Sequence, residues 1–253
     1  MKKKIISLTL ALVLSLSTAA FAASGTWYLD EYGWWYGYED GDYAADRWEY
    51  LGGEWYHFNA AGYMETGWIW DGGWYYLRQD GSMAVGWTWD GANWYYLYPN
   101  GVMATGWALD GENWYYLDAS GIMQNGWIKY ADSWYYLDQD GVMVTGWAPI
   151  DGFWYYMNPD GAMATGWVLD GENWYYLNEY GLMQTGWLKT GGSKYYLNSD
   201  GSMATGTQTI DGEEYTFNED GTCQDDEIVP DYDGFILTEK IAEYAKNLVA
   251  KAT

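Results

Sequence analysis

The sequence has almost none of the residues on which most catalytic and metal sites depend. Its 253 residues include one cysteine, Cys223, and one histidine, His57. A single cysteine excludes an intrachain disulfide, and the two residues together cannot build a Cys/His zinc site. A Ser-His-Asp triad would have to use His57. We therefore predict a protein that is not an enzyme and needs no metal or cofactor.

Basic residues are also scarce. Eleven Lys and Arg residues stand against 36 Asp and Glu residues, which gives a formal net charge of −25. Binding to nucleic acid or to an anionic lipid surface depends on a basic face, and this composition does not supply one. The sequence therefore predicts no nucleic-acid partner.

Aliphatic side chains are too few for an ordinary core. Leu, Ile, Val and Phe together account for 42 residues, a share that normally indicates disorder in so acidic a chain. The chain also contains 20 Trp and 28 Tyr, which bury a large area per residue. We therefore expect a folded chain whose core is aromatic rather than aliphatic.

The first 22 residues have the pattern of a secretion signal. Three lysines at positions 2–4 precede an apolar run, and Ala20-Phe21-Ala22 matches an A-x-A cleavage site. The apolar run is too short for a permanent membrane span. We expect residues 1–22 to be a signal peptide and the secreted chain to have no membrane span.

A unit of about 20 residues repeats along most of the chain. Each unit opens on a first tryptophan and contains a second tryptophan seven residues later, or six in one case. The first tryptophans are Trp48, Trp68, Trp87, Trp107, Trp127, Trp147, Trp167 and Trp187, and the second are Trp55, Trp74, Trp94, Trp114, Trp134, Trp154 and Trp174. Six consecutive units continue as Trp-Tyr-Tyr-Leu or Trp-Tyr-Tyr-Met, followed by a turn with Gly and then a Met.

Each unit predicts a short β-hairpin. Trp-Tyr-Tyr-Leu suits a pleated, half-buried strand, and segments such as Asp110-Gly111-Glu112-Asn113 supply the positive-φ residues of tight turns. A hairpin of this length is only marginally stable alone. We therefore expect successive units to stack into an all-β, β-hairpin solenoid.

The pattern weakens at both ends, which gives five expected segments. Residues 1–22 are the signal, residues 23–47 a degenerate first unit, residues 48–206 the full units, and residues 207–222 a degenerate last unit. Residues 223–253 are expected to be an acidic linker and a short C-terminal helix, because their apolar residues fall at helical spacing.

Alternation along the strand divides the aromatic residues between two faces. Trp114 and Tyr116 share one face of their hairpin, whereas Tyr115 and Leu117 share the other and are expected to fill the core. On the first face, two tryptophans of one unit and the second tyrosine of the next can converge on the gap between hairpins. Three aromatic faces in an acidic protein favour a quaternary ammonium ligand, at about 0.5–2 kcal/mol per contact.

The unit Gly-Trp-x(6)-Trp-Tyr-Tyr-Leu-x(3)-Gly-x-Met-x-x-Gly-Trp resembles the choline-binding, or cell-wall-binding, repeat of Gram-positive surface proteins. The resemblance covers roughly residues 27–221. It implies a left-handed β-hairpin solenoid that holds choline groups of teichoic acids non-covalently at the cell surface. It also implies that each site uses the two tryptophans of one repeat, a tyrosine of the next and a nearby methionine.

Carried onto this chain, the resemblance implies seven choline sites. They are Trp48, Trp55, Met64 and Tyr76; Trp68, Trp74, Met83 and Tyr96; Trp87, Trp94, Met103 and Tyr116; Trp107, Trp114, Met123 and Tyr136; Trp127, Trp134, Met143 and Tyr156; Trp147, Trp154, Met163 and Tyr176; and Trp167, Trp174, Met183 and Tyr196. The pattern fails at both ends, where Trp27 and Trp34 would meet His57, and Trp187 would meet Lys194 and Thr216. We expect no choline at the last position because a lysine repels a cation.

The function predicted from these features is that of a secreted, non-catalytic cell-wall-binding protein, attached non-covalently through choline-bearing teichoic or lipoteichoic acid. Two other functions fit the same aromatic surfaces. A carbohydrate-binding module would stack glucans or host glycans on the flat rings, although sugar sites usually need more convergent polar groups than this repeat offers. An adhesive or structural surface protein would use the repeats only to space out a partner site.

Residues 237–246, Leu-Thr-Glu-Lys-Ile-Ala-Glu-Tyr-Ala-Lys, resemble the first helix of an NlpC/P60-type cysteine peptidase. No Cys or His follows them in this sequence, so the chain is not expected to be that peptidase. The segment is interpreted either as part of a shortened relative of such an enzyme or as a helix that caps the array.

Overall fold

The computed structural model describes residues 24–224, and in this part of the chain every regular element is a β-strand. The predicted all-β class is confirmed, whereas the expected signal peptide and C-terminal helix lie outside the described residues. The strands are β1 (Gly25–Asp30), β2 (Gly33–Tyr38), β3 (Arg47–Leu51), β4 (Glu54–Phe58), β5 (Gly67–Trp70), β6 (Trp74–Leu77), β7 (Gly86–Trp89), β8 (Trp94–Leu97), β9 (Gly106–Asp110), β10 (Asn113–Leu117), β11 (Gly126–Tyr130), β12 (Ser133–Leu137), β13 (Gly146–Ile150), β14 (Phe153–Met157), β15 (Gly166–Asp170), β16 (Asn173–Leu177), β17 (Gly186–Thr190), β18 (Ser193–Leu197), β19 (Gly206–Ile210) and β20 (Glu213–Phe217).

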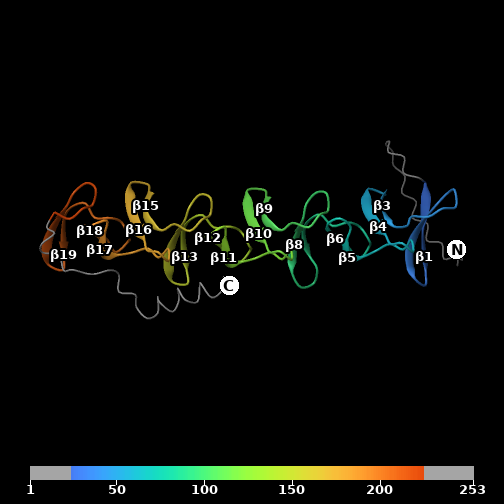
Figure 1. Ribbon diagram of the computed structural model, residues 1–253, viewed down its shortest axis with the longest axis horizontal. Coiled ribbons are helices and arrows are strands. Elements are labelled where there is room, and N and C mark those ends of the chain that lie inside the picture. Colours follow the sequence, from blue (N-terminus) through green and yellow to red (C-terminus); the bar gives the residue numbers. More distant parts are fainter. Residues whose placement is uncertain (1–23, 225–253) are drawn as a thin grey trace. The chain divides into compact units, whose positions relative to one another are not determined.

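Consecutive strands pair into hairpins, each a two-stranded sheet of its own (Figure 1). In the hairpin of β11 and β12, the antiparallel register places Trp127 opposite Tyr136 and Lys129 opposite Trp134. Because side chains alternate along a strand, these four side chains share one face. The same register recurs from hairpin to hairpin, so each hairpin presents the equivalent four positions on one face.

Each hairpin leads into a tight connection closed by hydrogen bonds. After β12, the Asp138 carboxylate accepts bonds from the backbone N–H groups of Asp140 and Val142, both at 2.9 Å. The N–H of Gly141 donates to the Asp138 carbonyl at 3.0 Å, and Gly141 has a φ of 80°, which residues with a Cβ rarely adopt. The Asp-x-Asp-Gly segment therefore has a structural role in closing the connection.

Neighbouring hairpins are linked by a recurring backbone hydrogen bond, called here the Met–Trp joint. The N–H of the methionine in each connection donates to the carbonyl of the second tryptophan of the preceding hairpin, as Met163 does to Trp134 at 2.7 Å. The same bond, at 2.7–2.9 Å, joins Met64 to Trp34, Met83 to Trp55, Met103 to Trp74, Met123 to Trp94, Met143 to Trp114, Met183 to Trp154 and Met203 to Trp174. Both partners are main-chain atoms, so the joint does not require particular side chains.

The core is more aliphatic than the composition led us to expect. The largest fully buried side chains are Phe58, Leu77, Leu97, Leu117, Leu137, Tyr155, Met157, Leu177 and Leu197. All of them except Tyr155 end the second strand of their hairpin. The expectation of a core that is aromatic rather than aliphatic is therefore wrong, whereas the expected position of Leu117 in the core is confirmed. One aliphatic residue per repeat is enough when every repeat buries it at the same position.

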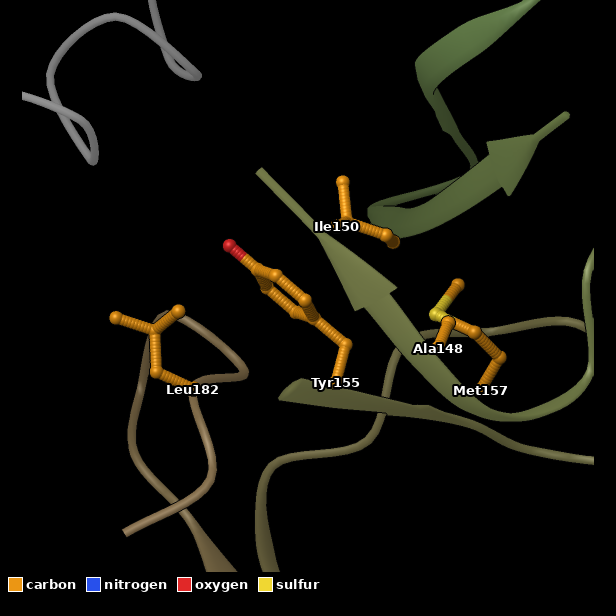
Figure 2. Close-up of a cluster of buried hydrophobic side chains, with 5 residues drawn as sticks. All are labelled: Ala148, Ile150, Tyr155, Met157 and Leu182. Atoms are coloured by element: carbon orange, nitrogen blue, oxygen red, sulfur yellow. The ribbon is translucent and has the colours of Figure 1, made fainter. Parts of the chain in front are cut away.

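The chain divides into two compact units, one of residues up to 110 together with 116–123, and one of residues 111–115 together with those from 124 onward. Within the first unit, one buried cluster centres on Phe58. Within the second, Ala148, Ile150, Tyr155, Met157 and Leu182 form a cluster (Figure 2). In Figure 2 the side chains of strands β13 and β14 meet Leu182 from a later connection, so residues distant in the sequence share this core.

Carboxylates in the connections predict a dependence of stability on acid pH. The hydroxyl and N–H of Ser202 both donate to Asp200, at 2.6 and 2.9 Å, and these bonds lower the pKa of Asp200 below its ordinary value of 3.8. A pKa that is lower in the folded chain stabilises the fold above about pH 4, and this contribution is lost as the pH falls through the folded-state pKa. The free energy of unfolding should therefore fall below pH 4, and Ser202→Ala should weaken that dependence. Urea unfolding at pH 6 and pH 3 measures it; an equal loss in both proteins would contradict this account.

Candidate ligand-binding site

The two tryptophans of a hairpin meet nearly at a right angle. The ring centroids of Trp127 and Trp134 lie 6.3 Å apart, with 89° between the ring planes. The pairs Trp147–Trp154 (6.4 Å, 81°) and Trp167–Trp174 (6.5 Å, 87°) have the same geometry. The register explains it, because the two rings sit diagonally across one face of the hairpin. The space between the first and second tryptophan of a hairpin is called here the tryptophan corner, and a compact ligand placed in it can contact both indole rings.

Most of the second tryptophans leave this corner open to solvent. Between 41 and 47% of each residue's surface is exposed at Trp55, Trp74, Trp94, Trp114, Trp154 and Trp174, whereas Trp134 is half-buried. The first tryptophans of these hairpins are half-buried too, as Trp147 is where it contacts Tyr175 of the following hairpin. One ring of the corner is therefore fixed by packing, and the other is available to a ligand.

Most first tryptophans contact a tyrosine ring of their own hairpin, and several also contact one of the next hairpin. Trp147 lies 5.1 Å from Tyr156 of its own hairpin and 4.7 Å from Tyr175 of the next. The contact with the next hairpin recurs at 4.6–4.9 Å in the pairs Trp48–Tyr75, Trp68–Tyr95, Trp127–Tyr155 and Trp167–Tyr195. These are the first tyrosines of Trp-Tyr-Tyr-Leu, one position before the tyrosines that the resemblance implied.

The implied tyrosines lie against the first tryptophans of their own hairpins. Their ring centroids are 5.1–5.2 Å apart in the pairs Trp68–Tyr76, Trp87–Tyr96, Trp107–Tyr116, Trp127–Tyr136, Trp147–Tyr156, Trp167–Tyr176 and Trp187–Tyr196. Each therefore extends the aromatic face of its own hairpin beside the tryptophan corner.

The methionines are tied to the preceding hairpin. The resemblance grouped Met143 with Trp127 and Trp134, whereas the Met–Trp joint links Met143 to Trp114 and links Met163 to Trp134. Met163 and Trp127 both pack against the cluster of Ala148, Tyr155 and Met157. The methionine whose main chain is bonded to a tryptophan pair thus comes from the repeat that follows it, whereas the side chain of Met143 lies against Gly161.

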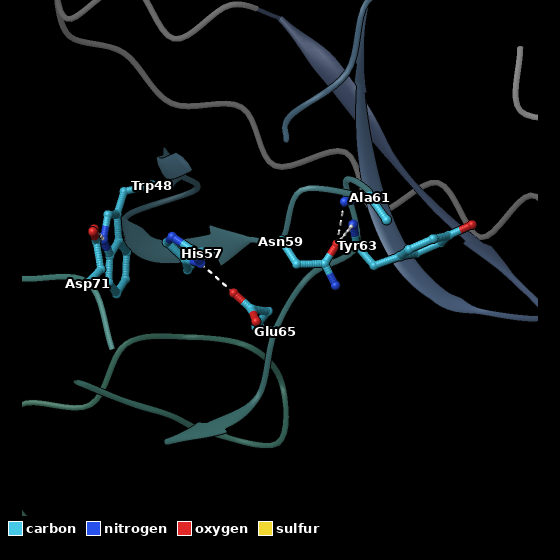
Figure 3. A network of polar contacts seen from close by, with 7 residues as sticks. All are labelled: Trp48, His57, Asn59, Ala61, Tyr63, Glu65 and Asp71. Atoms are coloured by element: carbon cyan, nitrogen blue, oxygen red, sulfur yellow. Dashed lines mark hydrogen bonds and ion pairs between the residues drawn. The ribbon is translucent and has the colours of Figure 1, made fainter. Parts of the chain in front are cut away.

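An aspartate of the following hairpin holds four of the first tryptophans. The indole Nε1 of Trp147 donates to the Asp170 carboxylate at 3.0 Å. Equivalent bonds run from Trp48 to Asp71 (2.8 Å, the pair drawn in Figure 3), from Trp68 to Asp90 (3.3 Å) and from Trp87 to Asp110 (3.1 Å). We did not predict these residues from the sequence. The pattern that could have indicated them is an aspartate three positions after the first tryptophan of a repeat.

At one of these positions, hydrogen bonds favour the charged form of the Asp90 carboxylate. Burial works against the charge of Asp90, but hydrogen bonds from the backbone N–H groups of Asn93 and Ala92 and from the Trp68 indole outweigh it, and the pKa of Asp90 is lowered. A full negative charge therefore lies at the edge of the Trp68 ring at neutral pH. Aromatic faces beside a fixed anion suit a cationic ligand.

His57 is part of the Trp48 hairpin face. Its ring centroid lies 5.0 Å from that of Trp48, which it faces across the register, and its Nδ1 is 2.5 Å from the Glu65 carboxylate (Figure 3). It therefore occupies the position that a second tyrosine takes in the later hairpins.

At the N-terminal end, Trp27 and Trp34 were expected to meet His57 in place of a tyrosine. These two tryptophans form the usual corner, with centroids 6.5 Å apart and 82° between the planes. From the next hairpin, Trp27 contacts Tyr56 at 5.0 Å and Phe58 at 5.5 Å.

At the C-terminal end, the first tryptophan keeps its tyrosine contacts, but the second tryptophan that would complete the corner is absent. Trp187 contacts Tyr196 at 5.2 Å and Tyr215 at 4.9 Å, as its equivalents do. The second tryptophan is replaced by Lys194, which faces Lys189 across the register. This hairpin thus keeps one indole and places two lysines where the corner would be.

Three hairpins of the first of the two compact units carry a further exposed aromatic ring opposite the second tryptophan. The pairs are Tyr50–Trp55, Trp70–Trp74 and Trp89–Trp94, with ring centroids 5.2, 5.5 and 5.6 Å apart. The added residues are 50, 65 and 49% exposed. Among the residues from 24 to 224, no group of three His, Cys, Asp or Glu side chains could hold a metal ion, and no helix is long and apolar enough to cross a membrane.

Comparison with known proteins identifies the family. A family model described as the choline-binding repeat matches residues 84–123, 105–145, 144–183, 168–207 and 184–221. A second, described as a putative cell wall binding repeat, matches residues 46–64 and 66–83. The chain belongs to the choline-binding repeat family. No curated protein sequence matches it.

Solved structures of choline-binding proteins have the same fold. CbpJ from Streptococcus pneumoniae TIGR4 is 30% identical with a TM-score of 0.57, over 79% of this chain and 87% of that one. CbpF, solved in complex with ipratropium, is 35% identical with a TM-score of 0.60, over 76% of each chain. The modular autolysin LytC from Streptococcus pneumoniae, in complex with a synthetic peptidoglycan ligand, is 30% identical with a TM-score of 0.60, over 78% of this chain and 46% of LytC. The predicted β-hairpin solenoid is therefore confirmed as the fold class of this choline-binding repeat protein.

Proposed function

We propose that this choline-binding repeat protein is a secreted, non-catalytic protein that attaches to the cell wall by holding choline groups of teichoic or lipoteichoic acid. The observation that carries the proposal is the recurring corner of two perpendicular indoles, such as Trp147 and Trp154, beside a carboxylate such as that of Asp170. A trimethylammonium group is attracted by the π faces and by the carboxylate, and its methyl groups are buried against the rings.

Several weak sites on one chain give firm attachment to a polymer. Each cation–π contact contributes about 0.5–2 kcal/mol, so a single cage of two or three rings binds weakly. Teichoic acids present many copies of their substituents, so the second and later sites bind at a high effective concentration. Attachment through several cages is therefore strong without a covalent anchor, and free choline competes for it.

The non-catalytic part of the proposal rests on the scarcity of catalytic side chains. The only histidine in the sequence, His57, is engaged by Glu65 and lies against Trp48. Binding repeats of this family also occur in enzymes, as in the autolysin LytC, so the proposal for this chain concerns its own residues.

A second candidate function, carbohydrate binding, is favoured by the exposed ring pairs of the first of the two compact units. Trp70 is 65% exposed and lies 5.5 Å from Trp74, with Asp71 next to it in the chain. Flat exposed rings stack on sugars, and a nearby carboxylate accepts hydrogen bonds from sugar hydroxyls. This function would use the hairpins of β3 to β8 and leave the later ones to choline.

Calorimetric titration of the full chain with choline chloride tests the proposal. Saturable heat with several equivalents of choline per chain is expected, with sodium chloride as the control for ionic strength and a soluble glucan as the control for sugar binding. Heat with the glucan alone would favour the carbohydrate function instead. Silence with both ligands would contradict ligand binding and leave the tryptophans with a purely structural role.

A further inference from the structure

Three of the implied cages, those of Trp107, Trp127 and Trp167, have no aspartate three positions after the first tryptophan of the following repeat, where Tyr130, Ile150 and Thr190 stand. At the position of Asp170 the preceding hairpin has Ile150, which is 4% exposed and packs with Tyr155 and Leu182 (Figure 2). The indole that would have bonded to a carboxylate here is that of Trp127. Its Nε1 is buried and, in the described part of the chain, has no hydrogen-bond partner.

The same cage also carries a positive charge. Lys129 faces Trp134 directly across the register, where the Trp147 cage has the uncharged Pro149 opposite Trp154. The aspartates in the hairpin turns, Asp132 and Asp151, are common to both. The two cages therefore share their aromatic geometry and differ in the charge that surrounds it.

This difference in charge bears on which ligand each cage accepts. A carboxylate within a few ångströms of a bound cation, in a partly buried site, raises affinity by about tenfold or more, because the surrounding dielectric is low. A lysine beside the rings acts in the opposite direction. Trp127–Trp134 and Trp147–Trp154 have nearly equal ring geometry, and they differ in the charge around the rings and in the second tryptophan, which is half-buried at Trp134 and exposed at Trp154.

We propose that the aspartate three positions after the first tryptophan of the following unit is a specificity-determining residue of the cage before it. Cages that have it, those of Trp48, Trp68, Trp87 and Trp147, bind quaternary ammonium ions. The Trp127 cage, with Ile150 and Lys129, does not bind them and serves to pack two hairpins together. This inference rests on the proposed choline function and separates the four cages that have the aspartate from the Trp127 cage.

Reciprocal substitutions in the full chain test the proposal by choline calorimetry. Asp170→Ile should remove one equivalent of choline or weaken it at least about tenfold. Asp170→Asn keeps a hydrogen-bond acceptor for Trp147 but removes the charge, and it should weaken the same site. Ile150→Asp and Lys129→Leu should each strengthen binding at the Trp127 cage, which adds an equivalent to the isotherm. Lys129→Leu keeps the test valid if Ile150→Asp does not fold, because leucine stands at the same position in Leu109 and Leu169.

The outcomes separate this inference from the function on which it rests. If wild type binds no choline, the proposed function fails, and the inference fails with it. If wild type binds choline and Asp170→Ile and Asp170→Asn keep its stoichiometry and affinity, the aspartate is not a determinant and only the inference fails. Wild-type affinity in Asp170→Asn together with loss in Asp170→Ile would show that the hydrogen bond, not the charge, is what matters, and would overturn the assignment of specificity to charge.

Discussion

Trp147→Ala should remove one equivalent of choline from the titration of the full chain, whereas Trp187→Ala should remove none. Trp147 forms one wall of a corner with Trp154, and its N–H is held by Asp170. Losing one ring from a cage costs about 0.5–2 kcal/mol of direct cation–π attraction, and the rearrangement of the remaining rings adds to it. At least about a tenfold loss of affinity at this site is expected.

Trp187 is a closely matched control because the two tryptophans pack alike. Trp147 contacts tyrosines at 5.1 and 4.7 Å, and Trp187 contacts tyrosines at 5.2 and 4.9 Å. Both substitutions should therefore lower the free energy of unfolding by a similar amount, about 2–4 kcal/mol for a half-buried indole. Only Trp147 has a tryptophan partner in its corner, since Lys194 stands in that place beside Trp187. Equal loss of choline in both variants would show that the effect came from destabilisation and not from the cage.

Leu177→Ala should lower the free energy of unfolding by about 2–5 kcal/mol, whereas Leu169→Ala, in the same hairpin, should change it by less than about 0.5 kcal/mol. Leu177 is fully buried at the end of β16, and Leu169 on β15 is 51% exposed. The first substitution leaves a cavity against the neighbouring repeat, and the second removes a side chain that faces water. Urea unfolding followed by tryptophan fluorescence measures both.

The size of the Leu177 effect also reports how far one repeat depends on the next. Stability in a tandem array is a sum of intrinsic and nearest-neighbour contributions, so a defect in one hairpin weakens its own two interfaces. A broadened or split urea transition in Leu177→Ala would therefore accompany the loss. A Leu177→Ala protein as stable as Leu169→Ala would contradict the view that one buried aliphatic residue per repeat forms the core.

The hairpins and their facing tryptophans could be predicted from sequence because both follow from short-range periodicity. Trp127, Trp134 and Tyr136 belong to one hairpin, and strand alternation alone fixes their common face. The partners from the next repeat could not be fixed in this way. Whether Tyr155 or Tyr156 meets Trp127 depends on how one hairpin is rotated and shifted against the next, which a repeat pattern does not encode.

The hydrogen bonds that place a carboxylate beside a cage could not be predicted from the sequence either. Asp71, Asp90, Asp110 and Asp170 look like ordinary turn residues in an acidic chain, and only their bonds to indole N–H groups distinguish them. Ile150 likewise looks like an ordinary apolar strand residue in the sequence, and only the structure shows that the buried N–H of Trp127, which packs against the same cluster, has no acceptor among the described residues. The hairpins could thus be predicted from local patterns, whereas the bonds between repeats, which we propose set the charge beside each cage, could not.

The Met–Trp joint has a consequence for how such a chain can change. Its donor and acceptor are peptide groups, and the equivalent bond forms even between Cys223 and Lys194, at 2.9 Å, where neither characteristic side chain is present. A unit can therefore be duplicated, deleted or diverted to another ligand while the backbone connection to its neighbours stays the same. The frame is carried by atoms common to all amino acids, which leaves the aromatic and charged side chains free to diversify one position at a time.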